Sequence, residues 1–268
     1  MNGGTDPAAK AAEIGEALSR MEREHGLRTL FAVESGSRAW GFESADSDWD
    51  VRAVAVRSLR DYLRLGEPRR DTWAAMLPGD IDIVVWDLRK AAAHWAKGNA
   101  AVAEWFGSPI VYRDEGGWMG RLREAARGAF KPETAAWHYA SMWAKAVERA
   151  GGLAPRMPVK PLCYALRANV CARWALQKRT MPPTRFDEAL AGLDIAESAR
   201  EEIRAMVARK AAANEWDEAD VTPGMVPLLA DLREELRAEN WEPTDEELEC
   251  RRAAGKALEG LFQEAVLG

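Results

Sequence analysis

The spacing of hydrophobic residues is mixed in the first third of the chain and helical in the rest. Residues 8–24 carry apolar side chains at helical spacing and predict a helix that Gly26 ends. Apolar and β-branched residues predict one strand from there to about residue 34 and a second over residues 49–56. Short helices are expected up to Trp40 and over residues 58–65.

A turn sequence at residues 77–80 separates two further apolar segments, 71–76 and 81–86, and predicts a hairpin. The remaining pattern is helical. Helices are predicted over residues 88–96, 100–106, 116–127, 132–150, 161–178, 186–193, 195–213, 224–240 and 245–267. This order predicts an α+β protein rather than alternating βα units. We expect a unit with a small mixed or antiparallel sheet over residues 1–128 and a helical unit over residues 129–268.

Composition restricts the class of protein. Hydrophobic residues make up 47% and charged residues 30%, as in ordinary globular proteins. We find no apolar run of about 18 residues and no basic-then-apolar leader, so neither a membrane span nor a secretory signal is expected. The cysteines, Cys163, Cys171 and Cys250, lack metal-site spacing, which favours reduced thiols in the cytoplasm.

Charge is distributed unevenly along an acidic chain whose net charge is −6. Residues 149–186 contain no Asp or Glu but many Lys and Arg, a pattern typical of a phosphate or polyanion contact. The alternative is a solvated helix face whose cations pair with the acidic residues of segment 187–264.

Two carboxylates stand close together in the second strand. Asp48 and Asp50 are two residues apart, so both side chains project from the same strand face. Such a pair repels unless a cation lies between them, and Mg²⁺ prefers one or two carboxylates plus substrate phosphates. The Gly36-Ser37 turn after the first strand lets backbone N–H groups approach a phosphate. Together they predict nucleotidyl transfer.

Gly36-Ser37, ten intervening residues, and then Asp48-Trp49-Asp50 resemble the signature of the DNA polymerase β-like nucleotidyltransferase superfamily. The resemblance implies a third carboxylate on a neighbouring strand between apolar residues. Asp82 fits that position, and Asp80 is the alternative. It also implies a palm-like sheet and two Mg²⁺ ions, or Mn²⁺, bound with a nucleoside triphosphate.

A narrower resemblance extends over about residues 30–186, to predicted nucleotidyltransferases named for an RNA-repair pathway. It is carried by residues 36–41, 47–52, 86–90, 98–99, 104–105, 108–110, 138–139, 160–167 and 173–174. It implies transfer of a nucleoside monophosphate to an acceptor hydroxyl, on an RNA end, with release of pyrophosphate. The alternatives are transfer to a protein or small molecule, and a nucleotide-binding sensor without turnover.

The resemblance implies roles for individual residues of the strand-rich unit. Asp48 and Asp50 would hold the ion on the nucleotide side, and Asp82 would complete a second ion position. The triphosphate would be held by Gly36, Ser37 and Arg38.

Other candidate binding residues have two interpretations each. Arg52, two residues after Asp50, either contacts substrate or neutralises the carboxylates before metal binds. Lys160, Tyr164 and Arg167 share one helix face and are expected to bind the nucleotide. The alternative for these three residues is packing that stabilises the fold.

Overall fold

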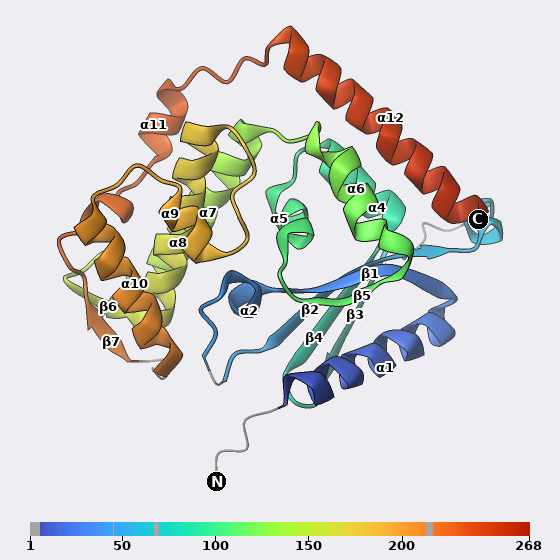
Figure 1. Cartoon of the computed structure of the whole chain (residues 1–268), viewed down its shortest axis with the longest axis horizontal. Helices are drawn as coiled ribbons and strands as arrows, with labels where there is room; N and C mark the ends of the chain where they lie inside the picture. The colour runs from blue at the N-terminus through green and yellow to red at the C-terminus, as the bar shows by residue number, and fades with distance from the viewer. Residues whose placement is uncertain (1–5, 45, 67–69, 213–216) are drawn as a thin grey trace. The chain divides into compact units, whose positions relative to one another are not determined.

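We describe a computed structural model, which covers residues 6–44, 46–66, 70–212 and 217–268. The chain forms two compact units (Figure 1). The first unit comprises the described residues up to Ala39, Ser47–Phe130 and Thr244–Gly268. The second unit comprises Trp40–Asp46 and Lys131–Pro243. Residues 1–5 of the predicted unit 1–128 and residue 213 of the predicted helix 195–213 lie outside the described residues.

A five-stranded mixed sheet forms the centre of the first unit. Its strand order is β3-β4-β2-β1-β5; β2 and β4 run parallel, and the other neighbours run antiparallel. The strands are β1 (Leu27–Ser35), β2 (Trp49–Arg57), β3 (Thr72–Leu77), β4 (Ile81–Asp87) and β5 (Val111–Asp114). The α+β class is therefore confirmed, and β3 and β4 form the predicted hairpin.

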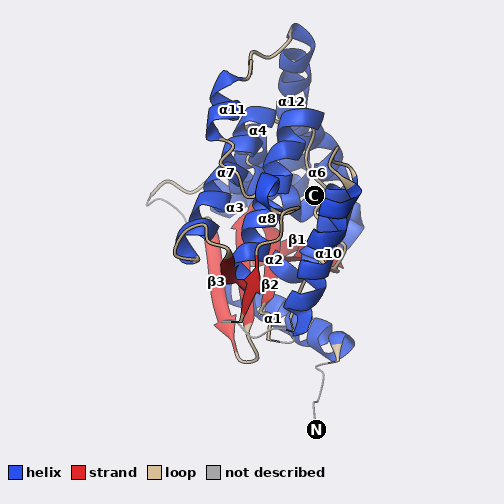
Figure 2. Ribbon diagram, turned by 90° about the vertical axis from the view of Figure 1, so that its left-hand side faces the viewer, coloured by secondary structure: helices blue, strands red, loops and turns tan. Residues whose placement is uncertain are grey.

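Different helices cover the two faces of this sheet (Figures 1 and 2). α1 lies on one face, where Val51 and Ala53 of β2 pack with Ile14 and Leu18. On the other face Val54 packs with residues of α4, α6 and α12. The helices of this unit are α1 (Pro7–His25), α2 (Gly36–Trp40), α3 (Leu59–Tyr62), α4 (Leu88–Ala96), α5 (Ala100–Ala103), α6 (Trp118–Arg127) and α12 (Asp245–Leu267), with 3₁₀ turns at Glu104–Gly107 and Glu115–Gly117.

The second unit is mainly helical. The long helices α7 and α8 pack side by side along it (Figure 1). Its elements are α7 (Pro132–Arg149), β6 (Arg156–Pro158), α8 (Val159–Lys178), α9 (Phe186–Ala191), α10 (Glu197–Ala212), β7 (Glu218–Asp220), a 3₁₀ turn at Val226–Leu228 and α11 (Arg233–Ala238). No helix in the described ranges is long and apolar enough to cross a membrane.

The structure departs from the predicted elements in three places. The single helix predicted over residues 224–240 is replaced by a 3₁₀ turn and the short α11. Asp231 Oδ1 accepts the Arg233 backbone N–H at 3.0 Å, a local hydrogen bond that competes with a continuous helix and starts α11 separately. Strands β5, β6 and β7 were not predicted, because none has an alternating apolar pattern. The predicted division at residue 128 assigns residues 244–268 to the second unit, whereas α12 packs on α4 and α6 of the first.

Candidate active site on the mixed sheet

The parallel pairing of β2 with β4 brings two of the predicted carboxylates together. Asp50 lies directly opposite Asp82 in the register, near the start of both strands. The alternate residues, Val51 and Ile83, are buried on the α1 face. Asp50 and Asp82 therefore project from the opposite face, and both are partly exposed there. Asp80 instead lies in the turn before β4.

Arg52 lies between the two carboxylates. Its Nη2 atom is 3.0 Å from Asp50 Oδ1 and 2.9 Å from Asp82 Oδ2. Its Nη1 atom donates to the backbone carbonyls of Val51 and Asp82, each at 3.0 Å. Burial raises the pKa of Asp50, and the neighbouring Arg52 opposes that shift. Arg52 is thus ion-paired with both carboxylates, and a contact of Arg52 with substrate stays a prediction.

The Gly36-Ser37 turn directly adjoins Asp50. β1 ends at Ser35, which pairs with Asp50 in the register, and Gly36 begins α2 with a φ of +64°. A Cβ atom at Gly36 would lie 2.2 Å from Asp50 Oδ2, so only glycine allows the backbone to come this close to the carboxylate. Ser37 follows in the same turn and is buried.

Asp48 lies in the loop before β2 and is exposed. Arg38 holds this loop: its Nε atom donates to the Asp48 carbonyl at 3.1 Å and its Nη2 atom to the Ser47 carbonyl at 2.6 Å. The Arg38 guanidinium also lies 3.9 Å from the centre of the Trp49 ring. Arg38, predicted to bind the triphosphate, therefore anchors the loop that carries Asp48.

A buried acid that sequence reasoning missed supports Asp50 from the other face of the sheet. Glu34 is 0% exposed, and its Oε1 atom accepts the Asp50 backbone N–H at 2.7 Å. The Tyr112 hydroxyl donates to Glu34 Oε2, and Ser108 Oγ donates to the Glu34 carbonyl at 2.6 Å. A glutamate at the end of the apolar run Phe31-Ala32-Val33 was the available signal. Burial raises the pKa of Glu34 to about 7.

The raised pKa of Glu34 predicts a pH-dependent stability. Because the folded state binds the Glu34 proton more tightly than the unfolded state, this contribution is complete below about pH 4.5 and is lost as the pH rises through about 7. The free energy of unfolding should fall by up to about 3 kcal/mol from this group. Urea unfolding between about pH 5 and pH 8 measures it. In Glu34→Gln the decline should be largely absent, and parallel profiles for the two proteins would contradict the prediction.

The structure separates the three candidate residues of α8. Lys160 and Tyr164 line a cavity. Arg167 is 1% exposed, and its guanidinium carbon lies 3.8 Å from the centre of the Trp40 ring. Arg167 is therefore packed inside the second unit against Trp40, and its role in nucleotide binding stays a prediction.

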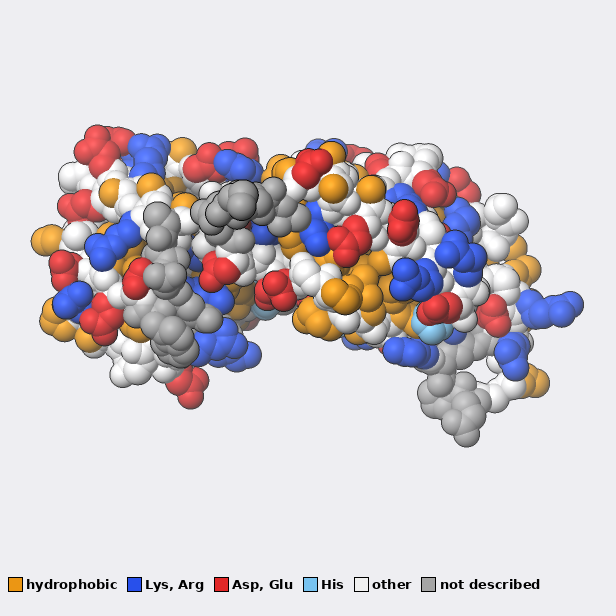
Figure 3. Space-filling view, turned by 90° about the horizontal axis from the view of Figure 1, so that it is seen from below, with side chains coloured by type: hydrophobic (Ala, Val, Ile, Leu, Met, Phe, Trp, Pro, Cys, Tyr) orange, Lys and Arg blue, Asp and Glu red, His pale blue; other side chains and the backbone are white. Residues whose placement is uncertain are grey.

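Several cations of the basic stretch 149–186 pair with acidic residues. Arg156 approaches Asp220 to 3.2 Å, and Arg179 approaches Glu239 to 3.4 Å. Arg173 is 4.0 Å from Glu235. These pairs correspond to the alternative of a solvated face paired with downstream acids. On the face seen in Figure 3, basic and acidic side chains are interspersed.

Comparison with known proteins agrees with the resemblance drawn from the motifs. The model of RlaP, the RNA repair pathway DNA polymerase beta family, matches residues 11–263. The uncharacterized protein YcgL of Bacillus subtilis (strain 168) is 32% identical over 241 residues, which cover 87% of this chain and 92% of that protein. A solved structure of a nucleotidyltransferase-like protein from Exiguobacterium sibiricum 255-15 aligns with a TM-score of 0.31 and is 12% identical. The alignment covers 95% of this chain and 76% of that protein's chain. On the first two matches, this chain belongs to the RNA repair pathway DNA polymerase beta family.

Proposed function

We propose that this protein is a divalent-metal-dependent nucleotidyltransferase that moves a nucleoside monophosphate from a triphosphate to a hydroxyl at an RNA end. The observation that carries the proposal is the pairing of Asp50 with Asp82 across β2 and β4. Gly36 lets the turn that carries Ser37 lie close to Asp50. A phosphate bound by the N–H groups of this turn would therefore lie near the carboxylates. The family's description as an RNA repair pathway favours RNA as the acceptor.

The donor set fits Mg²⁺ or Mn²⁺. Asp48, Asp50 and Asp82 offer hard carboxylate oxygens, which Mg²⁺ takes together with substrate phosphates. Within the described ranges, no three His, Cys, Asp or Glu side chains form a ready-made metal site, so triphosphate oxygens would complete the ligands. Two bound ions would neutralise phosphate charge and acidify the acceptor hydroxyl. Arg52 supplies the positive charge between Asp50 and Asp82 in this structure, so Arg52 would have to move if these carboxylates held an ion.

The chain's own residues would hold the reactants. The Gly36 turn and the Ser37 hydroxyl would donate hydrogen bonds to the triphosphate, and Glu34 would keep the Asp50 backbone in place. The acceptor oxygen forms a bond to the α-phosphorus, while the bond from that phosphorus to the bridging oxygen breaks. Pyrophosphate leaves with the bonding electrons, and the hydroxyl proton passes to solvent.

Transfer of a radioactive label tests the proposed reaction. The full chain is incubated with each α-labelled nucleoside triphosphate, Mg²⁺ or Mn²⁺, and either total RNA or total protein. We expect label on RNA that disappears when a chelator removes the divalent ion. Label on polypeptide alone would contradict the RNA acceptor. Measurable triphosphate binding without label on any acceptor would contradict catalysis and favour a sensor.

A further inference from the structure

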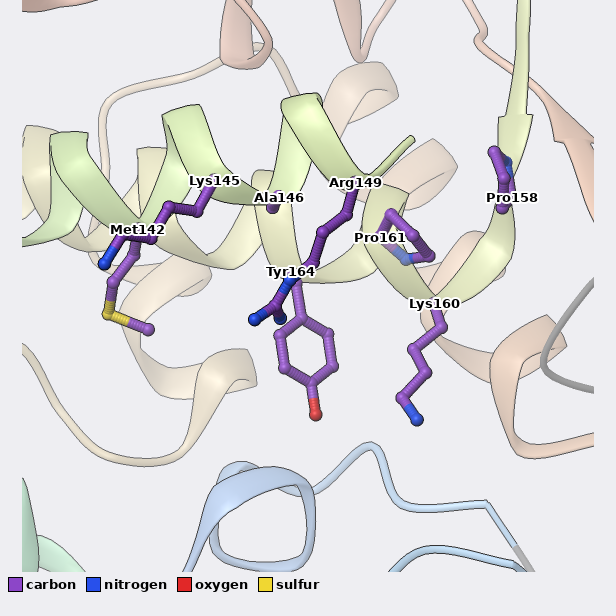
Figure 4. Close-up of a pocket in the computed structure, with 8 residues that line it drawn as sticks. All are labelled: Met142, Lys145, Ala146, Arg149, Pro158, Lys160, Pro161 and Tyr164. Carbon is purple, nitrogen blue, oxygen red and sulfur yellow. The ribbon is translucent and has the colours of Figure 1, made fainter. Parts of the chain in front are cut away.

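The second unit contains a cavity lined by none of the carboxylates of the proposed reaction. It encloses about 550 Å³ between α7 and the start of α8 (Figure 4). α7 contributes Met142, Lys145 and Arg149, and α8 contributes Lys160, Pro161 and Tyr164. This volume lies within the range of ligand-binding pockets, so the cavity is large enough to hold one nucleotide.

The charged side chains that line the cavity are cationic. Three of its lining side chains are cationic, and none is Asp or Glu. Lys145 and Arg149 form no ion pair with any residue that the structure describes, in contrast to Arg156 and Arg179 of the same unit. Like charges four residues apart on a helix repel each other. The C-terminal dipole of α7 favours Arg149 but does not account for Lys145 one turn earlier.

An aromatic ring borders these cations. The Tyr164 ring makes edge contacts with Trp40 at 5.3 Å and with Phe42 at 6.0 Å between centroids, so it is held on one side by packing. In Figure 4 its hydroxyl end points away from α8, and the Arg149 side chain is drawn beside the part of the ring nearest the helix. Rings beside a basic groove are the usual platform for bases of single-stranded nucleic acid. Met142 and Pro161 add apolar surface for a base.

The lining favours a nucleic-acid strand over a free triphosphate. A triphosphate binds as a metal complex and needs carboxylates for its ion, and this lining has none. A strand instead carries one charge per nucleotide and is bound by cations in a row. Lys145 and Arg149 are separated by about 6 Å of helix rise, a distance of the order of that between adjacent phosphates of an extended strand.

We propose that this cavity binds a single-stranded segment of the RNA acceptor, with Lys145 and Arg149 on successive phosphates and one base against Tyr164. The identity of this strand as the acceptor rests on the proposed function. Lys160 and Tyr164 would then keep their predicted nucleotide-binding role, toward nucleotides of the acceptor.

Fluorescence anisotropy tests this binding, with a labelled oligouridylate of about 12 nucleotides and no triphosphate or divalent ion. In the variant Lys145→Gln/Arg149→Gln, we expect RNA binding to weaken by about 10-fold or more. The slope of log K against log salt should shrink by about 1.4, since each lost phosphate contact contributes about 0.7. The matched control, Arg156→Gln/Arg179→Gln, removes the same charge from ion-paired positions outside the cavity and should leave affinity nearly unchanged.

Several results would overturn the proposal. Equal weakening in both double variants would show that only net charge matters. Loss of fluorescent-ATP binding with normal RNA binding in Lys145→Gln/Arg149→Gln would identify a triphosphate site instead. The proposed reaction is judged separately: Asp50→Asn should bind the oligonucleotide as the unchanged protein does. If RNA binding depends on Lys145 and Arg149 but no nucleotide is transferred, the proposed reaction is refuted and the RNA site in the cavity is not. If nucleotide is transferred but RNA binding does not depend on Lys145 and Arg149, the RNA site in the cavity is refuted and the reaction is not.

Discussion

Asparagine in place of Asp50 should lower nucleotide transfer to RNA by about a thousandfold, equivalent to about 4 kcal/mol of transition-state stabilisation. The substitution keeps the side chain's volume and an oxygen that can accept from Arg52. It removes the charge that would hold a divalent ion beside the triphosphate. Because burial already raises the pKa of Asp50, a neutral side chain should cost little stability. Single-turnover rates and thermal unfolding measure the two effects.

Matched variants of the hairpin test which carboxylate completes the site. Asp82→Asn should reduce transfer by about a hundredfold or more, because Asp82 faces Asp50 in the register. Asp80→Asn should leave the rate unchanged: Asp80 is exposed in the turn, and asparagine tolerates its φ of +58°. Equal loss in the two variants would contradict the assignment of Asp82. A normal rate in Asp50→Asn would contradict the whole site.

Alanine at Gly36 should be nearly as damaging as the loss of Asp50. Its methyl group would lie 2.2 Å from Asp50 Oδ2, so the carboxylate or the turn must move. The left-handed backbone at Gly36 adds about 1 kcal/mol of strain for any other residue. We expect about a hundredfold lower transfer, because displacement of a catalytic group by about 1 Å has effects of this size. The midpoint of thermal unfolding should also fall by several degrees.

Gly15→Ala is the matched control for Gly36→Ala. Gly15 lies inside α1, and a Cβ atom there would meet no atom within 4 Å. Alanine should therefore raise the free energy of unfolding by about 0.5–1 kcal/mol and leave transfer unchanged. If Gly36→Ala transferred nucleotide at the normal rate, the close approach of this backbone to Asp50 would not matter for the reaction.

Elements with local signals were predicted closely. The helix at residues 88–96 begins where the Asp87 side chain accepts the Arg89 backbone N–H at 2.8 Å. α12 begins at a capping box between Thr244 and Glu247. In both cases the signal consists of residues within one helical turn. The single helix predicted at 224–240 is wrong, because the apolar spacing that predicted it does not register the local hydrogen bond from the Arg233 N–H to Asp231.

Contacts between distant segments decided the rest of the candidate site. Glu34 gave a weak signal because its partners, Tyr112 and the Asp50 backbone, come from other strands. Arg52 contacts Asp82 only because β2 pairs with β4. Arg167 has the helix spacing of a ligand-binding residue, but Trp40 covers it in the folded chain.

The α+β class, most helix and strand positions, and the family could be read from the amino-acid sequence, because these depend on periodicity, caps and short motifs within a few residues. The packing of α12 in the first unit and the position of Arg52 between Asp50 and Asp82 became visible only in the folded chain. The tertiary structure also decided which cations of the second unit pair with acids and which line the cavity. Burial, ion pairing and strand register depend on contacts between residues far apart in the chain, and a local sequence pattern does not specify these contacts.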